Sequence, residues 1–267
     1  MGEVYVAEHT VLNQPFALKV LKAHIARDKN LSARFRREAQ VASRLEHPNI
    51  VFISDFGTMP NGMMYLVMEY IDGSSLKDAM DAVPGRRMPL IRALKILKQL
   101  SSALDHAHKK DIVHRDIKPD NLLLGSRADG GDLVKVLDFG LAKMLHGGEV
   151  LTKAGDLFGS PMYMSPEQCR GEPVDQSADL YSLGIVAYEM LSGSAPFTYK
   201  SIPQMIMAHI QEPVPALGTK LEEGPDAVPP EIEQFVMRCV EKDRANRPGS
   251  ALDFVTIIDD FLDAHQE

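Results

Sequence analysis

Two short polar segments, separated by about the length of one β-hairpin, constrain this chain more than any other feature. The first reads HRDIKPDN, and the second is the DFG that ends the run LVKVLDFG. Asp116 can accept a hydroxyl proton, and Lys118 can neutralise charge on a phosphoryl group. Asn121 and Asp138 supply hard oxygen ligands of the kind that magnesium prefers. Together, these groups suit phosphoryl transfer from a magnesium nucleotide.

None of these residues would be informative alone. A lone His114 is more often a packed or solvated histidine than a catalytic one, and an Asp-Phe-Gly triplet is common where a strand ends in a turn. The order of the two segments, the strand pattern between them and the downstream SPE at residues 165–167 together favour the functional interpretation. On these motifs the chain resembles the serine/threonine branch of the eukaryotic-type protein kinases, especially their bacterial members.

The resemblance implies an α+β fold with two lobes, a small antiparallel sheet lobe with one helix and a larger, mainly helical lobe. Residues 1–70 fit the small lobe and residues 71–267 fit the large lobe, and together they would form one protein kinase domain. The predicted strands are 3–9, 15–22, 50–56, 63–70, 121–124 and 133–137; the predicted helices are 31–46, 88–110 and 177–193, with two more after the proline-rich connection 211–233.

Composition narrows the class of protein. The 267 residues are 45% hydrophobic and 25% charged, as in an ordinary soluble domain. A net charge of −8 argues against nonspecific binding to nucleic acid or to anionic membranes. The two cysteines, Cys169 and Cys239, lack metal-type spacing and favour a reducing, cytoplasmic compartment. No apolar run approaches the roughly 20 residues needed to span a bilayer, and no signal for an oligomeric state is present.

The small lobe is expected to hold the nucleotide. By resemblance, Lys19 of FALK contacts the inner phosphates and Glu38 of FRREA fixes this lysine, although either residue alone would be read as a surface charge. Because the helix can swing away, the pair is expected to behave as a two-state element. The nucleotide-binding residues implied by the resemblance are Gly2, Val4, Ala17, Lys19, Glu38, Met68, the main chain of Glu69 and Ile71, Leu123 and Asp138, with Asn121 and Asp138 as the magnesium ligands.

Other motifs indicate the substrate class. Lys118, two positions after Asp116, and Ser160 in GSPMYMSPE are typical of serine/threonine kinases, so the expected partners are ATP and proteins with serine or threonine hydroxyls. The resemblance further implies a buried ion pair between Glu167 and Arg247, and a helix carboxylate, Asp179, that holds the catalytic loop. Kinases of small molecules lack the SPE and DRANRP segments, which disfavours that class.

The beginning of the chain departs from the family pattern GxGxxGxV. Gly2 and Val4 match its last glycine and its valine, whereas the first strand and the first two glycines are absent. Two interpretations follow: either the protein starts upstream, or this form exists and is a weak or catalytically idle, scaffold-like kinase. In both cases, strand 3–9 is expected to be an edge strand with unpaired backbone groups.

The segment after the DFG is expected to carry the switch. Arg115 and Lys143 are of the type that pairs with a phosphorylated residue, and Asp156 occupies the position of the phosphorylated threonine in many relatives. Asp156 is either a built-in acid that partly orders this segment or a solvated carboxylate. In the first case, Thr152 would be an additional autophosphorylation site.

Overall fold

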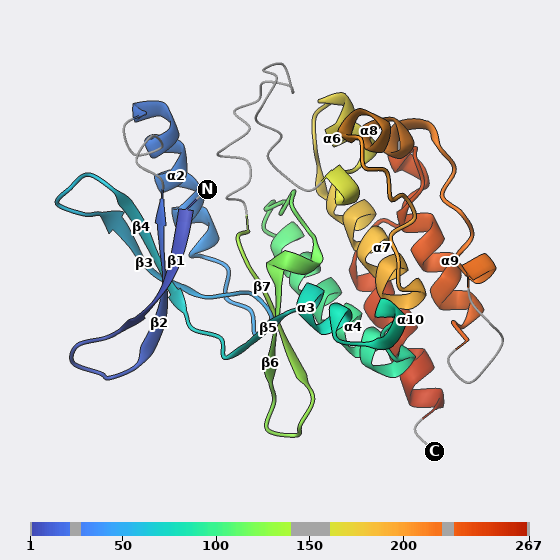
Figure 1. Cartoon of the computed structure of the whole chain (residues 1–267), viewed down its shortest axis with the longest axis horizontal. Helices are drawn as coiled ribbons and strands as arrows, with labels where there is room; N and C mark the ends of the chain where they lie inside the picture. The colour runs from blue at the N-terminus through green and yellow to red at the C-terminus, as the bar shows by residue number, and fades with distance from the viewer. Residues whose placement is uncertain (1, 22–27, 140–160, 221–226, 266–267) are drawn as a thin grey trace.

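The computed structural model describes residues 2–21, 28–139, 161–220 and 227–265. The predicted activation-segment residues Lys143, Thr152 and Asp156, and the predicted hydroxyl residue Ser160, lie outside these ranges. The predicted two-lobed α+β fold is confirmed, with a small sheet lobe beside a mainly helical lobe (Figure 1).

The small lobe is a four-stranded antiparallel sheet with one helix. The strand order is β1 (Gly2–Glu8), β2 (Pro15–Leu21), β4 (Met64–Glu69) and β3 (Ile53–Thr58), so β1 is an edge strand, as predicted. The register places Val6, Ala17 and Met68 opposite one another, and also Val4, Lys19 and Leu66. Because directly paired residues point to the same side of a sheet, these six side chains share one face.

The helix α2 (Lys29–Ala42) packs on the small-lobe sheet. Its N-cap residue Asp28 accepts hydrogen bonds from the backbone N–H groups of Asn30 and Leu31. Phe35, Ala39 and Ala42 form its buried stripe and join an apolar cluster with strand residues such as Leu66 and Met68. The helix ends four residues before the predicted end, because the chain turns there and Leu45 packs into the other lobe.

A second, three-stranded sheet lies between the small-lobe sheet and the helices, with the order β5 (Gly73–Ser75), β6 (Leu122–Ser126) and β7 (Asp132–Val136) (Figure 1). The strands β6 and β7 form the hairpin predicted between the two polar segments. The sequence indicated only a junction at β5, because three residues give no readable alternation.

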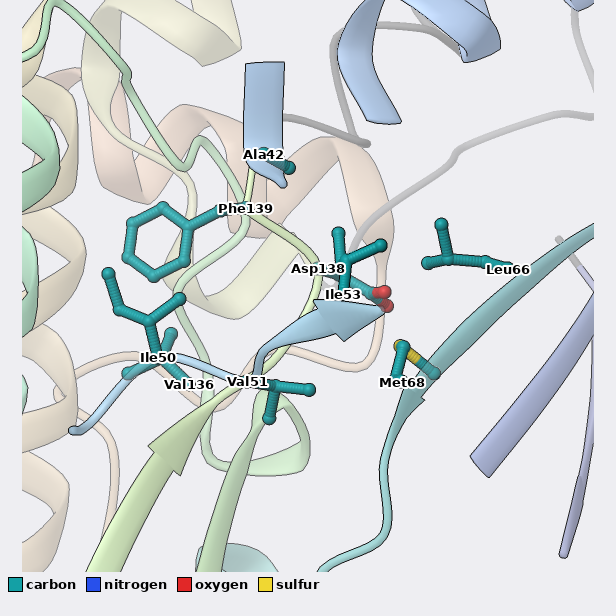
Figure 2. Close-up of a pocket in the computed structure, with 9 residues that line it drawn as sticks. All are labelled: Ala42, Ile50, Val51, Ile53, Leu66, Met68, Val136, Asp138 and Phe139. Atoms are coloured by element: carbon teal, nitrogen blue, oxygen red, sulfur yellow. The ribbon is translucent and has the colours of Figure 1, made fainter. Parts of the chain in front are cut away.

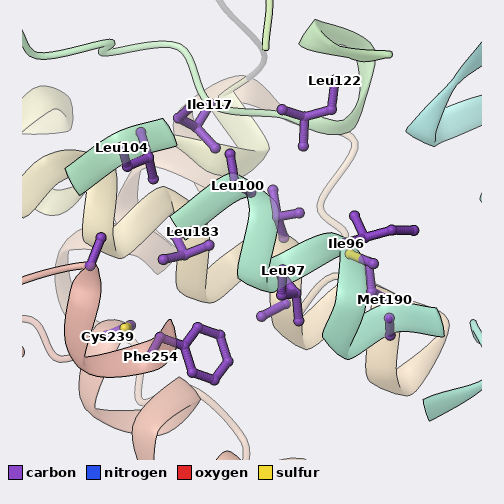
Figure 3. Packing of buried hydrophobic residues seen from close by; sticks show 14 of the residues in the cluster. Ile96, Leu97, Leu100, Leu104, Ile117, Leu122, Leu183, Met190, Cys239 and Phe254 are labelled. Atoms are coloured by element: carbon purple, nitrogen blue, oxygen red, sulfur yellow. The ribbon is translucent and has the colours of Figure 1, made fainter. Parts of the chain in front are cut away.

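The large lobe is built around two long helices, α4 (Leu90–His108) and α7 (Gln176–Ser192). Nearly every residue of α7 is buried, which explains why its apolar residues surround the whole helix. Side chains of α4 interdigitate with those of α7 and α10 (Figure 3). The remaining helices are α3 (Leu76–Asp81), α6 (Pro166–Arg170), α8 (Ile202–Gln211), α9 (Pro230–Cys239) and α10 (Leu252–Ala264).

The segment after α2 fastens the small lobe to the large one. Asn49 donates from Nδ2 to Gln99 Oε1 on α4 at 2.8 Å and to the Val134 carbonyl on β7 at 2.9 Å. Leu45 and Ile50 belong to the apolar core of the large lobe. The strand predicted at 50–56 therefore begins only at Ile53, because Ile50 forms a parallel bridge with Val136 instead.

Candidate active site

One buried carboxylate holds the backbone of the catalytic loop, which comprises residues 114–121. Asp179 on α7 has no exposed surface and accepts hydrogen bonds from the backbone N–H groups of His114 at 2.8 Å and Arg115 at 2.7 Å, and from His108 Nε2 at 2.8 Å. Burial alone would raise the pKa of Asp179, but the hydrogen bond and charge of His108 lower it below its ordinary value. The predicted contact between Asp179 and the loop backbone is confirmed.

The Asp116 carboxylate lies within a set of donors. Lys118 Nζ lies 3.1 Å from Oδ1 and 2.9 Å from Oδ2 of Asp116. Asn121 donates from Nδ2 to Oδ2 of Asp116 at 2.9 Å and to its carbonyl at 2.7 Å. The structure thus brings Asp116, Lys118 and Asn121 together, as the motif predicts. Since the Asn121 amide nitrogen is engaged with Asp116, the amide oxygen is the atom that could bind a metal ion.

Two residues of this region have backbone angles that are unfavourable for side chains with a Cβ. Arg115 has φ 69° and Asp138 has φ 60°, both in the left-handed region. Such conformations cost about 1–2 kcal/mol for a non-glycine residue and persist where the surroundings impose them. Arg115 belongs to the first of the two predicted catalytic segments, and Asp138 belongs to the second.

The lysine of the small lobe does not form the predicted pair. Lys19 Nζ lies 2.7 Å from Oδ1 and 2.6 Å from Oδ2 of Asp138, and its side chain is only 9% exposed. Glu38 is half-buried on α2 and makes no ion pair with any residue in the described ranges. The expected contact between Lys19 and Glu38 is therefore absent from the described residues, where Lys19 is neutralised by Asp138 instead.

His114 joins the two polar segments in a way that the sequence did not predict. Its Nε2 donates to the Leu137 carbonyl at 2.7 Å, and its Nδ1 accepts from the backbone N–H of Asp116 at 3.2 Å. The ring of His114 packs edge-on against Phe139 at a centroid distance of 4.7 Å. A buried histidine with both ring nitrogens engaged thus fixes the DFG segment relative to the catalytic loop.

Most of the residues expected around adenine lie in or next to the small-lobe sheet, whereas Leu123 lies on β6 of the second sheet. Ala17 and Met68 are paired neighbours, and Ile71 packs on the same apolar cluster. Val4 on the edge strand is 61% exposed, and Leu123 is half-buried on β6. Figure 2 shows a small pocket beside Met68, lined by apolar residues of α2, residues 50–51, β3, β4 and β7 and by Asp138 and Phe139 of the DFG segment.

Two further residues that were predicted to bind the nucleotide, Glu69 and Gly2, have structural roles in the described part of the chain. The Glu69 carboxylate accepts from Lys135 Nζ and from the backbone N–H of Phe52, both at 2.7 Å, so this side chain is engaged with neighbouring strands. A Cβ added at Gly2 would lie 2.2 Å from the Val20 carbonyl oxygen. The close approach of the β2 backbone is by itself a sufficient reason for glycine at this position.

The predicted buried ion pair between Glu167 and Arg247 is confirmed. Arg247 donates to Glu167 through two hydrogen bonds of 2.7 and 2.9 Å, and the two side chains are 0% and 2% exposed. Burial raises the pKa of Glu167, but the hydrogen bonds and charge of Arg247 outweigh it and lower the pKa below its ordinary value. This bidentate pair holds the start of α6 in the large lobe.

Comparison with known proteins decides the family. The model of the protein kinase domain matches residues 1–257. This chain belongs to the protein kinase domain family. It is 39% identical to serine/threonine-protein kinase pkn3 of Myxococcus xanthus over 94% of the chain, and 39% identical to PrkC of Bacillus subtilis over 99% of the chain. It is 40% identical to PknB of Mycolicibacterium smegmatis over 94% of the chain.

Solved structures agree with this assignment. The kinase domain resembles that of PknI from Mycobacterium tuberculosis with a TM-score of 0.73 and 29% identity, covering 97% of this chain and 90% of the other. The chain spans 46% of the length of pkn3 and 39% of the lengths of PrkC and PknB. Within the described ranges, no helix of this kinase domain combines the length and apolar character needed to cross a membrane.

Proposed function

We propose that this kinase domain transfers the γ-phosphoryl group of ATP to serine or threonine hydroxyl groups of proteins, with Asp116 as the base. The observation that carries the proposal is the arrangement of Asp116, Lys118 and Asn121, in which a carboxylate, a cation and an amide meet at 2.9–3.1 Å. The similarity to bacterial serine/threonine kinases over more than nine-tenths of the chain supports the substrate class.

In this mechanism each side chain has one task. Asp116 accepts the proton of the substrate hydroxyl, and Lys118 neutralises charge on the phosphoryl group as it passes between the two oxygens. Lys19 is assigned to the inner phosphates, which would require it to share or leave its contact with Asp138. Val4, Ala17, Met68 and Leu123, with the main chain of Glu69 and Ile71, are assigned to the adenine.

Magnesium is assigned to Asn121 and Asp138, whose oxygen atoms are of the type it prefers. No cluster of three or more histidine, cysteine, aspartate or glutamate side chains in the described ranges could hold a metal alone. Two protein ligands fit magnesium nonetheless, because nucleotide phosphates and water complete its coordination in kinases. The ion would neutralise negative charge on the transferring phosphate.

The compartment and the modification site are also proposals. The described structure contains two buried free cysteines, Cys169 and Cys239, which supports a reducing, cytoplasmic location. Thr152 is assigned as an autophosphorylation site, and mass spectrometry of phosphopeptides before and after incubation with ATP would test it. Arg115 Nε is buried and has no hydrogen-bond partner among the described residues, which supports its assignment as a group that receives an anion.

Replacing Asp116 by Asn tests the proposed mechanism. Transfer of radiolabelled phosphate from ATP to a basic protein should fall at least about a hundredfold, because the proton acceptor is lost. Nucleotide affinity should stay within about twofold, because the phosphate contacts remain. Asp120→Asn, which changes an exposed aspartate of the same segment, is the control and should transfer at the parental rate. An Asp116→Asn variant with the parental rate would remove Asp116 from the role of base.

A further inference from the structure

Gln168 uses both ends of its side chain, and each end serves a different part of the fold. Its Oε1 accepts from the backbone N–H of Ser165 at 3.0 Å, and the Ser165 hydroxyl accepts from the backbone N–H of Gln168 at 3.3 Å. This reciprocal pair is the capping box at the start of α6. The other end donates from Nε2 to the carbonyl of Arg115 at 2.8 Å. Helix α6 is thereby joined to the catalytic loop.

The carbonyl that Gln168 holds belongs to the peptide unit directly before Asp116. Because a peptide unit is planar, the Arg115 carbonyl and the Asp116 N–H move as one body. The Asp116 N–H donates to His114 Nδ1, and the Arg115 N–H donates to Asp179. Gln168 supplies the hydrogen bond to the Arg115 carbonyl, which lies between these two N–H groups. The stretch needs such contacts, since Arg115 holds an unfavourable φ of 69°.

The far side of Gln168 rests on an anchored element. Glu167 and Gln168 are consecutive residues of α6, and Glu167 is fixed by two hydrogen bonds from the buried Arg247. Ser165, which forms the capping box with Gln168, is fully buried. The start of α6 is therefore anchored in the large lobe, and Gln168 Nε2 connects this anchor to the peptide before Asp116. A contact anchored in this way can restrain the loop, unlike one from a solvated side chain.

We propose that Gln168 is a positioning residue for phosphoryl transfer, which sets the orientation of Asp116 by fixing the peptide between Arg115 and Asp116. The proposal rests on the proposed function, in which Asp116 is the base. The hydrogen bonds of Gln168 end on Ser165 and on the Arg115 carbonyl, so its proposed effect on transfer is exerted through the catalytic loop. It also links the segment that begins at Ser165 with the base, so a displacement of that segment is transmitted to Asp116.

The decisive variant is Gln168→Glu. Glutamate is as good a capping-box residue as glutamine, so the cap on Ser165 N–H remains, whereas the donor to the Arg115 carbonyl is lost. We expect kcat to fall about tenfold with KM for ATP unchanged and the melting temperature within about 2 °C of the parent. Gln204→Glu is the matched control, because Gln204 is exposed and occupies the same third position of α8. It should leave kcat unchanged.

A second measurement does not depend on activity. Hydrogen–deuterium exchange, followed by mass spectrometry of peptides that cover residues 113–118, should be faster in Gln168→Glu than in the parent and in Gln204→Glu. If the parent itself transfers no phosphate, the proposed function fails while exchange still tests the restraint. If Gln168→Glu unfolds, the uncharged Gln168→Met variant replaces it with the same expectations. Parental kcat, or parental exchange over these residues, in a folded variant would overturn the positioning role.

Discussion

The catalytic loop and the nucleotide-binding face of the small lobe hold their charged groups in different ways. In the loop, the backbone N–H groups of His114 and Arg115 are fixed by a fully buried carboxylate, Asp179. On the small-lobe face, Lys19 depends on one carboxylate, Asp138, whose side chain is 21% exposed, and its predicted partner Glu38 is not engaged with it. The backbone beside the proposed base, Asp116, is thus fixed from the core of the large lobe, whereas Lys19 has a single carboxylate partner that it could exchange for another.

The difference has a physical origin. A buried carboxylate that loses a partner leaves uncompensated charge or unpaired N–H groups in a medium that cannot solvate them. At the Lys19 contact the partner carboxylate, Asp138, is 21% exposed, so water can solvate it when the contact is lost, and two arrangements of similar free energy are possible. The comparison predicts that substitution of Asp179, which holds the loop, strongly lowers the free energy of unfolding. Substitutions at the Lys19 contact are expected to change mainly ligand binding.

The largest effect is expected for Asp179→Asn. This change removes the charge that compensates His108 and one of the two oxygens that accept backbone N–H groups of the loop. The free energy of unfolding should fall by about 3–5 kcal/mol, measured by urea denaturation. Asp81→Asn, which breaks ion pairs between exposed side chains, should cost less than about 1 kcal/mol. Similar losses in both variants would contradict the argument that burial makes the Asp179 contacts costly to break.

The same variant should alter the dependence of stability on pH. The pKa of Asp179 is lower in the folded protein than its ordinary value, so its contribution is complete above that ordinary value. The contribution is lost as the pH falls through the folded pKa. Denaturation curves measured towards acid should therefore converge for the parent and Asp179→Asn, and a constant difference at all pH values would exclude this titration.

An intermediate effect is expected for Asp138→Ala. Removal of a proposed magnesium ligand should weaken magnesium-dependent nucleotide binding by about 2 kcal/mol, roughly thirtyfold, and leave the magnesium-independent part unchanged. Titration of nucleotide with and without magnesium measures both quantities. The control Asp129→Ala changes an aspartate that is 65% exposed in the neighbouring hairpin turn. Unaltered metal dependence in Asp138→Ala would assign the ligand role to another residue.

The smallest effect is expected for Glu38→Gln without nucleotide. Since Glu38 makes no ion pair within the described ranges, the free energy of unfolding should change by less than about 0.5 kcal/mol. A double-mutant cycle with Lys19→Met should show no coupling without nucleotide and a measurable coupling with magnesium ATP, if the pair forms on binding. Coupling above about 1 kcal/mol in the free domain would show that the pair already exists there.

Motifs predicted the contacts that are set by the chain's own fold. The contacts of Asp179 and the pair of Glu167 and Arg247 were located correctly from the motifs shared with the kinase family, and burial of these charges makes a partner necessary. The relation between Lys19 and Glu38 was not predictable, because it depends on where a whole helix lies rather than on residue types. Sequence can supply both candidate partners, but it does not rank two arrangements that differ little in free energy.

Gln168 and His114 show a different limit. The pattern Ser165-x-x-Gln168 is readable as a capping box, so one half of the Gln168 contacts has a sequence signal. The other half ends on a main-chain carbonyl, which every residue possesses and which therefore leaves no trace in the sequence. The bond from His114 to the Leu137 carbonyl escapes prediction for the same reason.

The placement of Leu45 and Ile50 in the larger core has a consequence for how this domain can be divided. Both residues precede the last two strands of the small-lobe sheet in the chain, yet they fill space between helices of the other lobe. A fragment ending at residue 70 would expose them to water, and a fragment starting at residue 71 would leave a void in its interior. If the small lobe is exchanged between relatives, residues 43–51 should therefore stay with the large lobe on which they pack. The replaced parts of the chain should begin and end at the strands of the small-lobe sheet.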